Sequence, residues 1–156
     1  MNREIERKFL LKDDKASLKG IKSWEMIEQG YLKMHSPVVR IRTYGKTGYI
    51  TIKYNRSESG LGVDEYEYKI PLVEALQMLS ICKGRIKKCR YLYTAEDGHV
   101  WELDEFYLDN DGLVVAEIEL ESEDEKFTIP DFIGKEVTGD PKYFNNNLIE
   151  TPYKDW

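Results

Sequence analysis

The sequence predicts an all-β dominated (α+β) fold: a closed antiparallel β-barrel of about eight strands that forms a tunnel, with a few peripheral helices. Three observations lead to this prediction. Charged residues recur at alternate positions in short segments along the 156 residues, and alternate side chains of a strand point to one face. Bulky or apolar residues stand between them. Turn residues separate the segments at short intervals, as in antiparallel pairs.

Charged-x-charged triplets are the strongest of these observations. They are Glu4-Ile5-Glu6 (extended by Lys8), Arg40-Ile41-Arg42, Glu65-Tyr66-Glu67, Lys88-Cys89-Arg90 and Glu117-Ile118-Glu119. Like charges at this spacing repel, so the set as a whole indicates a functional site rather than a solvated sheet face. One triplet alone would be uninformative. If the sheet closes, the charged face lines the lumen.

The first half of the chain predicts strands and short connections. Strands are expected over residues 2–11, 26–34, 38–44, 49–54 and 63–70. Residues 12–20 are polar with weak helical character, and a turn follows at His35-Ser36-Pro37. The segment 55–62 is rich in Ser and Gly, which predicts a loop. Whether this loop acts as a lid stays open.

The second half begins with a helix that Pro71 opens and that runs to about Cys82. Proline is favoured at a helix start, and leucine and alanine recur with helical spacing after it. Strands are expected at about 85–94, 99–107 and 113–121. The tail predicts a short helix-like segment at Pro130–Gly134 and a helix over Asp140–Ile149. Asp140 would cap that last helix, with Pro141 at its first position.

Length and charge narrow the function classes. We expect a single domain over residues 1–156. The formal net charge of −6 argues against nucleic acid as a partner, because phosphate-backbone binding needs a basic surface. No signal peptide and no membrane-spanning apolar run are evident, so we expect a cytoplasmic protein without a membrane partner. Cys82 and Cys89 match no metal spacing and are expected to be reduced, packed thiols.

The paired glutamates suit a hard divalent cation. The Cα atoms of Glu4 and Glu6 should lie about 6.7 Å apart, close enough for their carboxylates to converge on one ion. Glu117 and Glu119 repeat this spacing. Such carboxylates favour Mg²⁺ or Mn²⁺ over zinc. His35 and His99 have no spaced partner and receive no metal role.

The paired bases suit phosphate. Arg40 and Arg42 share one strand face, and so do Lys88 and Arg90, while Lys53 follows Thr51 on its own strand. Guanidinium groups bind phosphate oxygens in pairs, and lysine adds a point charge. A polyphosphate bound with a metal ion would bridge the acids and the bases. The partner expected from these residues is therefore a small polyphosphate.

In this order the residues resemble the CYTH domain family, also called triphosphate tunnel metalloenzymes, and within it the bacterial inorganic triphosphatase-like members. Glu4-x-Glu6-x-Lys8 is similar to the family's N-terminal ExExK motif. The resemblance continues through Gln29-Gly30-Tyr31-Leu32, Val39–Arg42, Thr51-Ile52-Lys53, Glu65-x-Glu67, Lys88-x-Arg90, Asp104-x-Phe106, Glu117-x-Glu119-Leu120 and Glu136-Val137-Thr138-x-Asp140. It thus covers nearly the whole chain.

The resemblance implies a role for each matching residue. Implied metal ligands are Glu4, Glu6, Asp104, Glu117 and Glu119. Implied phosphate-binding residues are Lys8, Arg40, Arg42, Lys53, Lys88 and Arg90, with Glu65 and Glu67 beside the substrate on the tunnel wall. The residues expected to carry catalysis are Glu4, Glu6, Lys8, Glu117 and Glu119. Tyr143 and Asn147 fall where the family has a tail helix at one tunnel mouth, although capping and packing explain them equally well.

The activity that the resemblance implies is divalent-metal-dependent hydrolysis of a short polyphosphate, with inorganic tripolyphosphate as the expected substrate. The partner that it implies is thus a small-molecule triphosphate. Three alternatives stay open: a class IV adenylate cyclase that forms cyclic AMP from ATP, a thiamine triphosphatase, and a non-catalytic triphosphate-binding module. The choice between Mg²⁺ and Mn²⁺ also stays open. So does the oligomeric state, a homodimer being one option.

Overall fold

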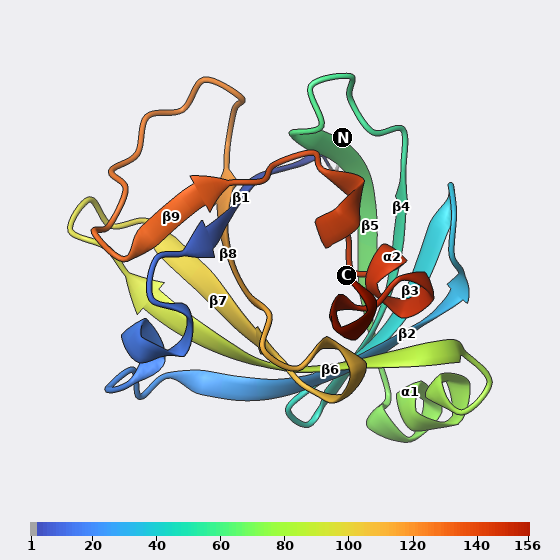
Figure 1. Ribbon diagram of the computed structural model, residues 1–156. Helices are drawn as coiled ribbons and strands as arrows, with labels where there is room; N and C mark the ends of the chain where they lie inside the picture. The colour runs from blue at the N-terminus through green and yellow to red at the C-terminus, as the bar shows by residue number, and fades with distance from the viewer. Residues whose placement is uncertain (1–2) are drawn as a thin grey trace.

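The structure is a computed structural model that describes residues 3–156. Its strands follow one another around a ring in the order β5-β4-β3-β2-β6-β7-β8-β1, and β5 pairs with β1 to close it (Figure 1). The strands are β1 (Arg3–Leu11), β2 (Trp24–Lys33), β3 (Val38–Tyr44), β4 (Thr47–Tyr54), β5 (Gly62–Ile70), β6 (Lys83–Thr94), β7 (Val100–Phe106), β8 (Val114–Leu120) and β9 (Ile133–Glu136). The predicted closed eight-stranded antiparallel barrel is confirmed, with β9 added outside the ring.

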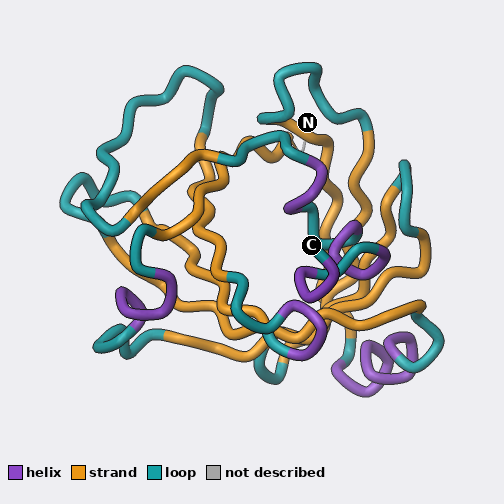
Figure 2. Tube along the Cα trace, viewed as in Figure 1, coloured by secondary structure: helices purple, strands orange, loops and turns teal. Residues whose placement is uncertain are grey.

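Helices are short; those of the C-terminal segment lie across the opening of the barrel, and the others lie around its outside (Figure 2). They are the α-helices α1 (Leu72–Leu79) and α2 (Asn147–Glu150) and the 3-10 helices η1 (Asp14–Leu18), η2 (Leu108–Asn110), η3 (Pro141–Tyr143) and η4 (Tyr153–Asp155). In residues 3–156, no helix combines the length and the apolarity that crossing a bilayer would require.

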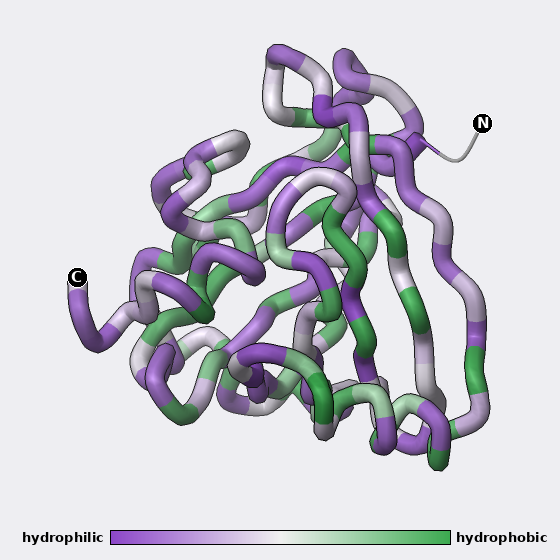
Figure 3. Tube along the Cα trace, turned by 90° about the vertical axis from the view of Figure 1, so that its right-hand side faces the viewer, coloured by the Kyte–Doolittle hydropathy of each residue, from purple (hydrophilic) through white to green (hydrophobic). Residues whose placement is uncertain are grey.

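The pairing register places charged residues of neighbouring strands side by side. Glu6 of β1 faces Glu119 of β8, and Lys8 faces Glu117. On the other side of the ring, Lys53 of β4 faces Glu65 of β5. The tube in Figure 3 shows the alternation of hydrophilic and hydrophobic residues along the strands. Residues that lie opposite each other on paired strands point to the same face of the sheet, so charged side chains from all strands of the ring line the lumen.

The apolar residues of the strands pack on the outside of the barrel. Phe9, Trp101 and Ile118 belong to a buried cluster that η1 and β9 cover with Leu18 and Ile133. A second cluster joins Ile41 of β3 to α1. The hydrophobic core therefore surrounds the ring, and the charged interior stays open for a ligand.

The prediction of a helix-like segment at Pro130–Gly134 is wrong, because strand β9 begins at Ile133. β1 pairs with β5 only through its first residues, up to Ile5. The later part of that edge would expose unpaired backbone groups, and β9 pairs there with Phe9 and Leu11. Satisfying the backbone hydrogen bonds of β1 thus outweighs the local helical pattern.

The prediction of one helix over Asp140–Ile149 is also wrong. The segment divides into η3 and the single turn of α2, with Phe144 in an extended conformation between them. Consecutive asparagines follow Phe144, and asparagine is a weak helix former. The predicted cap is confirmed, since the Asp140 side chain accepts a hydrogen bond of 3.1 Å from the Lys142 backbone N–H.

A candidate active site in the tunnel

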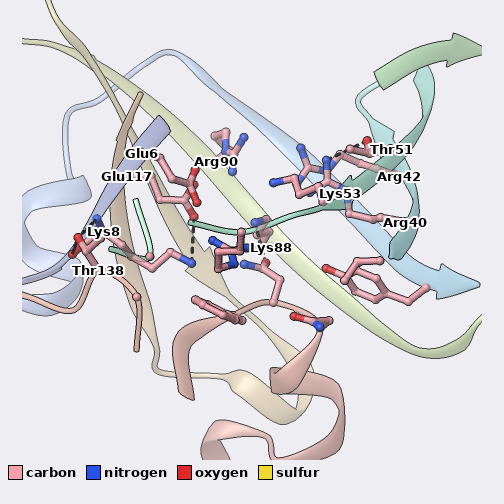
Figure 4. A pocket seen from close by; sticks show the side chains of 18 residues that line it. Glu6, Lys8, Arg40, Arg42, Thr51, Lys53, Lys88, Arg90, Glu117 and Thr138 are labelled. Atoms are coloured by element: carbon pink, nitrogen blue, oxygen red, sulfur yellow. Dashed lines mark hydrogen bonds and ion pairs between the residues drawn. The ribbon is translucent and has the colours of Figure 1, made fainter. Parts of the chain in front are cut away.

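Two adjoining cavities occupy the barrel interior, with about 750 and 690 Å³ of space that is partly open to solvent. Several side chains line both cavities, so these residues lie where the two meet: Glu6, Arg40, Arg42, Lys53, Arg90 and Glu117. Figure 4 shows Glu6 and Glu117 on one side of the space and Arg40, Arg42 and Lys53 on the other. The strands thus bring distant parts of the sequence to one lumen.

The two cavities differ in charge. Lys8, Arg56 and Lys88 line the first cavity alone, and we call it the basic cavity. The acids that line only the second, here the acidic cavity, are Glu4, Glu65, Glu67, Glu102 and Glu119. One end of the lumen therefore favours anions and the other favours cations.

Every predicted site residue except Asp104 lines one cavity or both. Asp104 is fully buried in the tunnel wall. Its carboxylate accepts two hydrogen bonds from Arg90, at 2.8 and 2.9 Å, and lies 2.7 Å from Lys88 Nζ. Both oxygens are thus engaged by bases that the sequence assigned to phosphate.

Most lumen cations are paired with carboxylates. Lys53 Nζ lies 2.8 Å from Glu4 and 3.5 Å from Glu65. Arg90 also contacts Glu102 at 2.9 Å. Lys8 Nζ is 3.7 Å from Glu117. Each of these contacts holds a charged side chain in place in the lumen.

Arg40 is held by β4 and β5. Its guanidinium donates to Thr51 Oγ1 at 3.1 Å and lies 3.3 Å from Glu67. Arg40 Nε is buried without a partner in the described residues. A buried N–H of this kind is costly unless an acceptor is supplied, which suits an anionic ligand.

Glu6 has a strongly shifted pKa. No ion pair of Glu6 occurs within residues 3–156. Burial, together with the carboxylates of Glu117 and Glu4, raises the pKa of Glu6 to about 8. Burial likewise raises the pKa of Glu65 to about 7, with Glu4 adding to the effect. Glu117 differs because, against its burial, the combined positive charges of Lys8, Arg90 and Lys88 lower its pKa to about 2.

This acidic cavity fits a hard divalent cation. Carboxylates that raise one another's pKa are stabilised in their ionised form when positive charge arrives. In residues 3–156, no three acidic, histidine or cysteine side chains converge closely enough to hold a metal ion by themselves. Mg²⁺ commonly uses one or two carboxylates, completing its shell with water and phosphate oxygens. The donor set therefore fits a metal ion that binds together with a phosphate ligand.

The C-terminal segment lies against the basic cavity. The Tyr143 carbonyl accepts from Lys8 Nζ at 3.1 Å, and Asn145 Oδ1 accepts from Lys88 Nζ at 2.9 Å. The Phe144 ring lies 4.5 Å from the Arg56 guanidinium, which comes from the loop at 55–62. By contrast, Asn147 lines neither cavity and donates to the Pro141 carbonyl.

Sequence reasoning missed several lumen residues. Glu102 had a detectable signal, because Glu102-Leu103-Asp104 is another charged-x-charged triplet. Thr51 and Gln29 are neutral and carry no charge pattern, yet both are fully buried beside the lumen arginines. Phe144 and Asn145 follow no strand or helix periodicity. Their place in the lumen depends on the course of the tail.

The model of the CYTH domain matches residues 2–153 of this chain. The chain belongs to the CYTH domain family. It is 44% identical to an inorganic triphosphatase of Acetivibrio thermocellus, with 100% of this chain and 99% of that protein covered. It is 34% identical to an inorganic triphosphatase of Nitrosomonas europaea, with 93% and 95% covered.

A crystal structure of an inorganic triphosphatase resembles this CYTH domain with a TM-score of 0.66 at 33% identity, covering 94% of this chain and 93% of the other. The family expected from the sequence is therefore confirmed. The basic and acidic cavities described above are therefore two parts of the interior of a CYTH domain.

Proposed function

We propose that this CYTH domain hydrolyses inorganic tripolyphosphate to pyrophosphate and phosphate inside its tunnel, with the help of Mg²⁺ or Mn²⁺. The observation that carries this proposal is the junction of a basic and an acidic cavity in one lumen. The inorganic triphosphatases of Acetivibrio thermocellus and Nitrosomonas europaea, similar over nearly their whole length, support the same substrate.

In this proposal Glu4, Glu6, Glu117 and Glu119 hold the divalent cation. All line the acidic cavity, and Glu6 and Glu117 also reach the basic one. When bound, such a cation supplies charge neutralisation at the phosphates and activation of water. Glu6, with its raised pKa, must lose its proton for this role, so cation binding and proton release are coupled.

The bases of the junction and the basic cavity bind the phosphates. Arg40 and Arg42 present guanidinium groups at the junction, and Lys8 and Lys88 present ammonium groups beside them. Positive charge fixed around the transferred phosphoryl group and the leaving pyrophosphate stabilises the charge of the transition state. Water attacks a terminal phosphorus, the bond to the bridging oxygen breaks, and pyrophosphate leaves.

Asp104 receives a different role in this scheme from the metal ligand implied by the resemblance. Since both of its oxygens contact Arg90 and Lys88, we assign it to positioning these bases. A carboxylate engaged by two cations is a poor ligand for a third. Glu102, which lines the acidic cavity, is the better placed carboxylate of β7.

The test is phosphate release from tripolyphosphate, ATP, thiamine triphosphate and pyrophosphate, with Mg²⁺ or Mn²⁺, and with cyclic AMP assayed in the ATP reaction. The expected result is fast release from tripolyphosphate and little from the others. Cyclic AMP with pyrophosphate would identify a cyclase instead. Tight binding of tripolyphosphate without turnover would identify a binding module.

A further inference from the structure

Gln29 of β2 lies fully buried beside the junction of the two cavities. It pairs with Arg42 of β3 across the sheet. Its Oε1 atom accepts two hydrogen bonds from that guanidinium, from Nε at 3.0 Å and from the terminal nitrogen Nη2 at 2.8 Å. An uncharged side chain thus fixes one side of a buried cation.

Arg42 differs from the other predicted phosphate-binding cations in its partners. Ion pairs within 4.0 Å join Lys8, Arg40, Lys53, Lys88 and Arg90 to carboxylates. No such pair involves Arg42 in the described part of the chain, and the residue is only 8% exposed. Its positive charge is therefore buried at the junction without a carboxylate within ion-pair distance in the described residues.

We propose that Gln29 is a positioning residue for Arg42: it holds the guanidinium toward the lumen without neutralising it, so that a triphosphate meets the full charge. The inference rests on the proposed function and deepens it, because it identifies which lumen cation is kept free for the substrate. A hydrogen bond to a neutral acceptor supplies geometry, while a buried ion pair would have to be broken or shared when phosphate binds.

The surroundings of Gln29 fix which way its amide points. Nε2 donates to the Tyr31 hydroxyl at 3.0 Å and to Asn145 Oδ1 at 3.3 Å. With the donor side engaged by these two oxygens, Oε1 is left facing Arg42. The same Asn145 oxygen accepts from Lys88 Nζ at 2.9 Å. Gln29 thus connects the Arg42 site to the C-terminal segment and to a second phosphate-binding cation.

The other charges around Arg42 make a neutral partner important. Burial lowers the pKa of Arg42 to about 10, with Arg40 and Arg90 adding to the effect and Asp104 opposing it. Arg40 and Arg90 have carboxylate partners, so the remaining repulsion falls on Arg42, which has none within ion-pair distance in the described residues. A glutamate at position 29 would relieve that repulsion permanently, and the protein would gain stability while losing attraction for phosphate.

The test compares Gln29→Glu with Gln29→Met and with Gln77→Glu. Gln29→Glu keeps the acceptor for Arg42 and adds a charge, and it loses the Nε2 donor to Asn145. Gln29→Met loses both the acceptor and that donor and adds no charge, so the two variants differ in the acceptor and the charge. Gln77 is exposed on α1, so Gln77→Glu is a control for the change in net charge. For each variant we would measure the melting temperature, the Kd for tripolyphosphate by calorimetry, and kcat and KM for phosphate release with Mg²⁺.

We expect Gln29→Glu to melt at or above the wild-type temperature while its Kd and KM for tripolyphosphate rise at least tenfold. Gln77→Glu should match the wild type in affinity. Gln29→Met should melt at a lower temperature and also bind more weakly. A Gln29→Glu variant that keeps its melting temperature but binds tripolyphosphate more weakly cannot be explained by a purely structural role of Gln29.

A Gln29→Glu variant that folds and binds tripolyphosphate as tightly as the wild type would overturn the inference. If Gln29→Glu does not fold, an unchanged KM in Gln29→Met would overturn it. A wild type that neither binds nor hydrolyses tripolyphosphate would instead refute the proposed function. The two failures are therefore distinguishable.

Discussion

Asp104 is the most deeply buried acid of the tunnel wall, and it holds two cations in place at once. Its ion pairs with Lys88 and Arg90 lie among side chains that are almost fully excluded from solvent. A buried pair is strongly destabilising to break, because the remaining charge has no solvent. The role of Asp104 in positioning therefore has a measurable consequence for stability.

We predict that Asp104→Asn lowers the free energy of unfolding by about 3–5 kcal/mol, since Lys88 would lose its only ion pair in the described chain. Asp109→Asn is the matched control, because Asp109 and Lys154 are 66% and 57% exposed in their ion pair. The control should cost less than about 1 kcal/mol. Denaturant unfolding measures both, and equal costs would contradict the positioning role.

Glu6 gives the metal-free protein an unusual dependence on pH. Its pKa of about 8 in the folded state lies above the ordinary value of 4.5. Between these values the folded chain holds a proton that the unfolded chain has released. The contribution of Glu6 to the free energy of unfolding is therefore largest at low pH and is lost as the pH rises toward 8. Its slope is at most about 1.4 kcal/mol per pH unit.

We predict that Glu6→Gln removes this part of the pH dependence. In EDTA, the stability of the variant relative to the wild type should grow as pH rises from 5 to 8. Added Mg²⁺ should oppose the trend in the wild type, because it favours the ionised carboxylate. Parallel stability curves for the two proteins in EDTA would contradict the assignment.

Residue by residue, the sequence predicted which side chains face the lumen but not which of them pair. Strand alternation decides the face, so Glu4, Glu6 and Lys8 were assigned together. The partner of each charge depends on the register between strands and on side-chain reach. The engagement of Asp104 by Lys88 and Arg90 could therefore not be anticipated from alternation alone.

At the scale of elements, the strands and α1 were predicted closely, and the tail was not. The tail has few residues of its own that specify a helix, and its conformation follows from what it packs against. β9 forms because β1 offers an unpaired edge, and the extended residue Phe144, which links η3 to α2, lies beside Lys8 and Arg56. Long-range contacts decide both outcomes.

Gly84 tests how the tail docks on the barrel. This residue of β6 has φ of +65°, and a Cβ placed there would overlap Ile149 of α2. Gly98 is the matched control, since its φ is +90° and no atom lies within 4 Å of such a Cβ. The two positions share backbone strain and differ in the contact with α2.

We predict that Gly98→Ala lowers the free energy of unfolding by about 1–2 kcal/mol, because alanine is disfavoured in the left-handed backbone conformation. Gly84→Ala should cost about 1–3 kcal/mol more, because Ile149 must move. Denaturant midpoints measure the difference. Equal costs would show that α2 does not pack against β6 as described.

At the scale of the whole molecule, closure of the barrel was predictable because charge alternates on nearly every strand. The separation of the lumen into a basic and an acidic cavity was not. That separation depends on how far each strand is staggered along the tunnel axis and on the position of the C-terminal segment. Neither quantity is encoded in a local pattern.

The central claim is that metal and phosphates bind at neighbouring places along one tunnel. A crystal of the protein soaked with Mn²⁺ and a non-hydrolysable imido analogue of tripolyphosphate tests it most directly, through anomalous scattering from manganese. We predict manganese among Glu4, Glu6, Glu117 and Glu119, with the analogue extending from it toward Arg42 and Lys88. Manganese outside the acidic cavity, or an analogue bound outside the lumen, would contradict the claim.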